Sequence, residues 1–206
     1  MESKNSIGNI HPVEANGSFG IKSENSPFAE SFYFEDFYDD KIVKKFIKNV
    51  EKLIRTSKEY KNYIENLRTN VLALNNDSIL GNITTADVDL EFHHYPFTLY
   101  EIVEVVMLDH FVNKKLFTSF SMAKEIMTLH NKHIIGLVPM TKTMHELAHS
   151  GGLFISQKQI FGDYKTFMAE YNSGVTLDMK NKVQTMEYYS QNGVPSDFKG
   201  LLWVFQ

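Results

Sequence analysis

Apolar side chains recur every three or four positions through much of the chain, which is the pattern of an amphipathic helix. From Asp39 onward this pattern predicts a long helix or a pair of helices. Its expected inward-facing residues are Ile42, Val43, Phe46, Ile47, Val50, Leu53, Ile54, Tyr60, Tyr63, Ile64 and Leu67. Acidic Asp39 and Asp40 suit the N-terminal end, where the helix dipole favours negative charge. Further helices are predicted over 98–112, 121–130, 163–171 and 177–191.

Short segments between these helices have the features of strands. Residues 88–92 alternate between polar and apolar and are stopped by Pro96, while residues 134–138 form an apolar run closed by Pro139. Residues 153–155 are expected to form another brief strand. A short helix is predicted over 141–149, ended by the sequence Ser-Gly-Gly. The pattern therefore predicts an α+β fold that is mostly helical.

The N-terminal part of the chain shows neither the apolar spacing of a helix nor the alternation of a strand. Residues 1–32 are rich in Ser, Asn, Gly, Pro and Glu, which predicts a flexible or extended arm preceding a single domain over 33–206. An aromatic cluster closes the arm: Phe28, Phe32, Tyr33, Phe34, Phe37 and Tyr38. This cluster either packs on the domain, which is the commoner case, or docks a partner protein. The apolar segment 201–205, which includes Trp203, is expected to pack on the core as a strand or tail.

Composition limits the chemistry that the chain can perform. With 206 residues, 43% apolar and 22% charged, it can bury one core of useful size. It has no cysteine, so disulfides, thiolate catalysis and cysteine-based metal sites are excluded, and any metal must be bound by His, Asp or Glu. No apolar run is long enough to span a membrane, and the N-terminus is too polar for a secretory signal. A cytoplasmic location without membrane contact is expected.

The charge of the chain gives no general attraction to nucleic acid, since the formal net charge is −4 and the pI is near 6.1. The most basic part is the helical region that starts at Asp39. Its cationic residues are Lys44, Lys45, Lys48, Lys52, Arg55, Lys58 and Lys61. Contact with nucleic acid is one interpretation of this face, and a solvated lysine face is the commoner one.

Four of the eight histidines have a spacing that indicates one metal site. His145 and His149 lie four residues apart on a predicted helix, so they share a face and can bind the same ion. Such a site needs a further ligand, which His93 or His94 can supply from the end of a strand. Neighbours on a strand point to opposite faces, which suits one ligand beside one proton acceptor. We expect all four histidines to meet around one divalent ion.

A strand ending in His-His, a proline soon after, a second strand and the sequence LVPxTxxxH with a closing His resemble the HNH (ββα-metal) endonuclease motif. The resemblance is strongest to HNH-related proteins of bacteriophages and covers residues 87–96 and 134–149, within a metal motif of 87–155. It implies an embedded ββα-metal element among the helices. It also implies DNA as substrate and one divalent ion, Mg, Mn, Ni or Zn, as cofactor.

The resemblance also implies a role for each histidine. His93 would be the strand ligand, and His145 and His149 the helix ligands. His94 would be the general base that deprotonates water for attack on a DNA phosphodiester. Gly136 occupies the position where the family usually has an Asn.

Two other functions compete with a DNA endonuclease. Residues 145–149 spell HExxH, the zinc metalloprotease signature, with Glu146 as general base and Glu170 or Asp163 as the candidate third ligand. This alternative leaves the His93-His94 pair unexplained. The other is a catalytically silent phage structural or interaction protein whose histidines bind a stabilising metal. In each case a protein partner could dock on the N-terminal arm.

Overall fold

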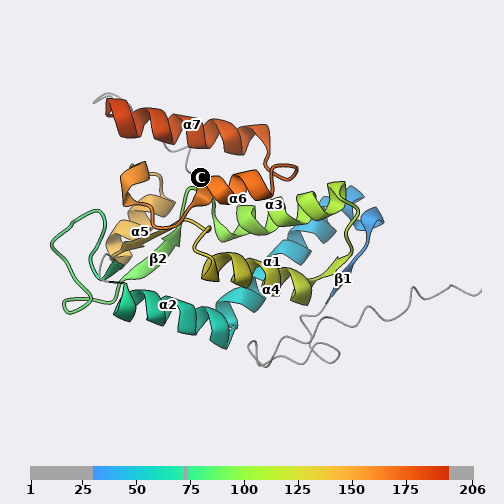
Figure 1. The fold of residues 1–206 in the computed structure, drawn as a ribbon, viewed down its shortest axis with the longest axis horizontal. Coiled ribbons are helices and arrows are strands. Elements are labelled where there is room, and N and C mark those ends of the chain that lie inside the picture. Colours follow the sequence, from blue (N-terminus) through green and yellow to red (C-terminus); the bar gives the residue numbers. More distant parts are fainter. Residues whose placement is uncertain (1–29, 72–73, 195–206) are drawn as a thin grey trace, which may run out of the picture.

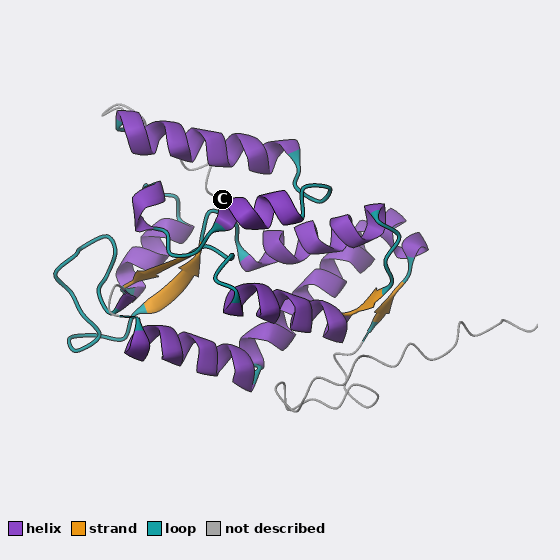
Figure 2. Ribbon diagram, in the orientation of Figure 1, coloured by secondary structure: helices purple, strands orange, loops and turns teal. Residues whose placement is uncertain are grey.

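The computed structural model describes residues 30–71 and 74–194 (Figure 1). Within these ranges the chain forms seven α-helices, two short 3-10 helices (η) and two antiparallel two-stranded sheets (Figure 2). The order is β1 (Ser31–Phe32), η2 (Phe34–Tyr38), α1 (Asp40–Thr56), α2 (Lys58–Asn70), β2 (Glu91–His94), α3 (Leu99–Val112), β3 (Phe117–Thr118), α4 (Ser119–Asn131), β4 (Leu137–Met140), α5 (Lys142–His149), η4 (Gln157–Gln159), α6 (Tyr164–Glu170) and α7 (Leu177–Asn192). The predicted α+β class, mostly helical, is confirmed.

The helical region from Asp39 is a pair of helices, one of the two forms that its apolar pattern allows. Ser57 separates them because its backbone is extended, and its hydroxyl accepts a hydrogen bond from the Tyr60 amide at the start of α2. Phe46, Ile47, Val50, Leu53 and Ile54 of α1 are buried as predicted. Ile42 was expected to face inward but is 41% exposed, since it lies in the first turn of α1, at the edge of the core.

Helix α3 lies in the middle of the helical layer and contacts both α1 and α4 (Figure 1). It buries apolar residues around most of its circumference, as expected for a helix enclosed by others. Its first turn is fixed by a capping box, in which Thr98 and Glu101 each accept a hydrogen bond from the other's backbone amide. The start of α3 therefore has a defined position beside the end of β2.

The strands β2 and β4 form an antiparallel ribbon in which His93 is opposite Val138 and His94 is opposite Leu137. Both strands start three residues later than predicted, and His93 and His94 are the last two residues of β2, which confirms that the histidine pair ends the strand. Residues 153–155 are not in a strand. Gly136 precedes β4 at a close approach of two backbones, because a Cβ there would lie 2.0 Å from the Tyr95 carbonyl oxygen. An Asn side chain has no room at this position.

The end of the predicted arm belongs to the domain. Residues Ser31 and Phe32 form β1, which pairs with β3, and Phe32 is only 4% exposed. Its ring packs against Phe37, Phe46 and Phe117, as the packing interpretation predicts, whereas Tyr33 and Tyr38 of the same cluster are exposed. Residues 1–29 of the arm, Phe28 among them, and segment 201–205 lie outside the described residues. None of the described helices has the length and apolar character needed to cross a membrane.

Candidate metal centre

The β2–β4 ribbon and helix α5 bring three of the four predicted histidines together. Alternation along β2 places Glu91 and His93 on one face of the ribbon. Helix α5 starts directly after β4, where Thr141 caps it, and its two histidines follow one turn apart on the face toward β2. His93, His145 and His149 each offer one nitrogen, and these three atoms all lie within 4.8 Å of one another.

The spacing of these nitrogens suits a common ion. The Nε2 atoms of His145 and His149 are 3.0 Å apart, and the ring of His93 lies 4.9 Å from each of the other two rings. Two nitrogens bound to one tetrahedral zinc at about 2.0–2.1 Å are roughly 3.3 Å apart. Small movements of the side chains would therefore bring the three nitrogens to the spacing of ligands on one ion.

A carboxylate that the sequence analysis missed orients one of these ligands. The Nδ1–H of His145 donates a hydrogen bond to Oε2 of Glu91. This contact fixes the tautomer of His145 and makes its Nε2 the acceptor that faces Nε2 of His149. Glu91 could have been found from the sequence, because it lies two residues before His93 on the same strand and must share its face.

The electrostatics of the site keep His93 and His149 in the neutral form that binds metal. Burial lowers the pKa of His93 to about 3, helped by the neighbouring charges of His145, His149 and Lys182. The pKa of His149 is also lowered, first by burial and then by His145. Because neither imidazole has to lose a proton at neutral pH, protons do not compete with an ion there.

The fourth predicted histidine, His94, lies apart from the other three. It follows His93 on the strand and leaves the opposite face, where it is buried against α4. Its Nε2 is 2.9 Å from Nε2 of His130, and the Nδ1–H of His130 donates to the Ile126 carbonyl oxygen at 2.8 Å. His130 must therefore accept through Nε2, and His94 donates. The expectation that all four histidines surround one ion is wrong, because strand alternation separates the two neighbours.

The general base and the third ligand that a metalloprotease would need do not lie at the histidine cluster. Glu146 is exposed and faces Lys142 at 4.0 Å. In the part of the chain that the structure describes, the third member of the histidine cluster is His93, and the cluster includes neither Glu170 nor Asp163.

The buried His94–His130 pair predicts that acid destabilises the protein. Burial lowers the pKa of His130 to about 4, and burial together with His130 holds the pKa of His94 well below its usual range. Below about pH 6.5 these two histidines bind protons in the unfolded chain but stay neutral in the folded protein. The free energy of unfolding should therefore fall as the pH drops to about 4. For His130 alone the loss is about 3 kcal/mol.

This loss can be measured by urea denaturation of the zinc-free protein between pH 7 and pH 4, compared with the variant His130→Gln. The variant should be less stable at pH 7 and should lose less stability on acidification. An equal pH dependence in both proteins would contradict the assignment.

Comparison with known proteins indicates that the chain is similar to virion proteins and not to nucleases. A family model described as bacteriophage G278-like virion protein matches residues 2–200. No curated protein and no solved structure matches the chain. The match agrees with the expected bacteriophage origin but overturns the HNH endonuclease resemblance, and with it the nuclease and hydrolase classes. It also overturns the cytoplasmic location, because a virion protein belongs to the particle.

The nuclease interpretation failed because the spacing of histidines indicates which residues can bind a metal ion but does not indicate a reaction. A strand and a helix that present three imidazoles can hold a metal ion, but this arrangement does not define a reaction. The same three ligands serve a structural ion as well as a catalytic one. The β2–β4 ribbon with α5 is therefore not evidence for an HNH element.

Proposed function

Because the chain belongs to the family of bacteriophage G278-like virion proteins, we propose that it is a structural component of the phage particle, stabilised by one metal ion at His93, His145 and His149. The family match, which spans residues 2–200, supports the place in the virion. The convergence of three histidine nitrogens supports the ion. The partners of such a protein are other proteins of the virion.

A bound ion would add an attachment between helix α5 and the β2–β4 ribbon. Helix α5 has only eight residues, and Ala148 is its one buried residue. Helices this short are unstable on their own and depend on contacts with the rest of the protein. An ion shared by β2 and α5 would fix the helix to the ribbon, and it would stabilise the fold because the unfolded chain does not present the three ligands together.

The donor set also narrows the choice of ion. Magnesium and manganese prefer oxygen ligands, whereas nickel and zinc bind imidazole nitrogen well. With three imidazoles and no carboxylate in the described cluster, nickel and zinc fit better than magnesium or manganese. We propose zinc, which is usually bound by four ligands and accepts imidazole nitrogens among them.

The place of the protein can be tested on phage particles purified through a density gradient. We expect mass spectrometry to detect the chain in the particle fraction at a constant ratio to the major capsid protein. A deletion phage complemented with a tagged copy provides the matched control, because the tag should appear in the same fraction. Finding the chain only among soluble proteins of the infected cell would contradict a structural role.

A further inference from the structure

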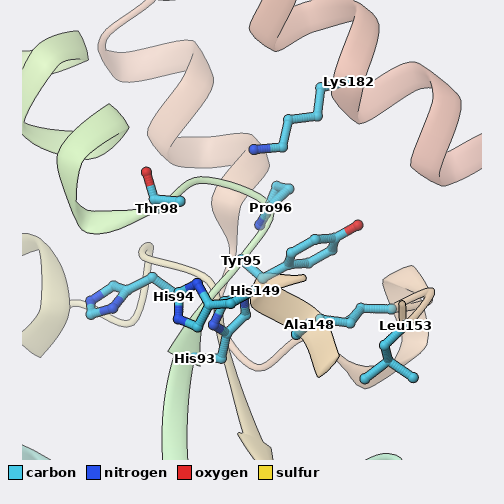
Figure 3. A pocket seen from close by; sticks show the side chains of 10 residues that line it. His93, His94, Tyr95, Pro96, Thr98, Ala148, His149, Leu153 and Lys182 are labelled. Atoms are coloured by element: carbon cyan, nitrogen blue, oxygen red, sulfur yellow. The ribbon is translucent and has the colours of Figure 1, made fainter. Parts of the chain in front are cut away.

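A pocket of about 180 Å³ adjoins the histidine cluster (Figure 3). The residues that line it are His93, His94, Tyr95, Pro96, Thr98, Ala148, His149, Leu153, Ile155 and Lys182. Two of the three candidate metal ligands are among them. Among the described residues that line the pocket there is no carboxylate, and the cationic side chain is that of Lys182, which reaches down from α7 in the close-up view. Such a lining favours an anion.

Three histidines leave an ion of this kind with an open position. Zinc usually has four ligands, and the described cluster supplies three. Glu91 is engaged by Nδ1 of His145, and exposed Glu146 faces Lys142, so neither carboxylate completes the set. His93 and His149 both border the pocket, so a ligand that enters the pocket lies next to the ion.

Lys182 is fixed in place beside this open position. Its side chain is 12% exposed, and its Nζ lies 3.1 Å from each carboxylate oxygen of Glu101. An ammonium has three N–H donors, and Glu101 takes at most two of them. At least one donor is therefore available for a further acceptor. Glu101 is itself fixed by the capping box of α3, so the lysine is positioned without the ligand.

On the basis of the proposed zinc centre, we propose that this pocket binds a small oxyanion, with one oxygen on the ion and another hydrogen-bonded to Lys182. Liquid water occupies about 30 Å³ per molecule, so the pocket has room for an acetate or a phosphate. A carboxylate could arrive as a free molecule or as the tip of an acidic side chain on a second copy of the chain. Both sources present the same two oxygens.

The test uses the full chain loaded with cobalt(II), whose visible absorption reports its ligands, titrated separately with sodium acetate and inorganic phosphate. We expect either anion to change the spectrum and to saturate. The variant Lys182→Met should weaken anion binding about tenfold, because it removes the contribution of one charge-assisted hydrogen bond to the binding free energy. Lys182→Arg should restore most of the affinity. Lys165→Met is the matched control, because it removes a similar ion pair, to Glu187, away from the pocket.

The outcomes separate this inference from the proposed metal centre. If cobalt fails to bind, the metal centre is wrong and the anion site fails with it. If cobalt binds but neither anion alters its spectrum, the metal centre remains and the oxyanion site is refuted. Equal anion affinity in wild type and Lys182→Met would also refute it. A spectrum that changes on protein dilution without added anion would identify a second copy as the source of the carboxylate.

Discussion

An excess of zinc is expected to raise the melting temperature of the metal-free protein by about 10 °C. The proposed ion would bind His93, His145 and His149 together only in the folded chain, so free zinc at a thousand times its dissociation constant would add about 4 kcal/mol to the stability. For a chain of this length, each kcal/mol shifts the melting temperature by about 2–4 °C. Circular dichroism melts in EDTA and in zinc would measure the shift.

Two pairs of variants decide whether the histidine cluster causes this shift. His149→Ala removes an exposed ligand, so the variant should fold but lose the response to zinc, whereas His133→Asn replaces a histidine outside the cluster and should keep it. Glu91→Gln should weaken zinc binding by about 10–100-fold, since it removes the charged partner of His145, whereas Glu146→Gln should not. An equal zinc response in His149→Ala and wild type would exclude this site.

The sequence predicts the helical part of the fold well because apolar periodicity reports burial directly. The stripe from Phe46 to Ile54 is buried as expected. The break at Ser57 gives a pair of helices, which was one of the two predicted forms. The strands were less predictable. Elements of two to four residues carry too short a pattern, so β1 and β3 were missed and the bounds of β2 and β4 were displaced.

The candidate site was predictable where the relation between residues is local. The spacing of His145 and His149 placed them on one face, and strand alternation separated the roles of His93 and His94. The partner of His94 was not predictable, because His130 lies 36 residues further along the chain and meets it only through the packing of α4 on the ribbon. Local spacing also could not distinguish a structural ion from a catalytic one, and the nuclease prediction was wrong for that reason.

A second large effect is expected from Asp77, a fully buried carboxylate that ties the loop before β2 to the start of α5. Its Oδ1 accepts hydrogen bonds from the amides of Ile79 and Leu80 at 2.7 and 2.8 Å, and its Oδ2 accepts one from the Thr141 amide at 2.6 Å. Asp77→Ala leaves three amides without their charged acceptor, so it should lower the free energy of unfolding by about 4 kcal/mol. Urea denaturation at neutral pH would measure the loss.

The same substitution should also weaken metal binding, because Thr141 is the N-cap of the helix that carries His145 and His149. Asp77→Asn is the sharper test: one amide oxygen still accepts from the loop, while its NH₂ group cannot accept from Thr141. This variant should fold, retain more stability than Asp77→Ala and bind zinc more weakly than wild type in calorimetric titration. Asp87→Asn, an exposed loop carboxylate that accepts from Thr84, is the control and should leave zinc affinity unchanged. If Asp77→Asn bound zinc as tightly as wild type, the position of α5 would not depend on this contact, and the ribbon alone would have to orient the helix ligands.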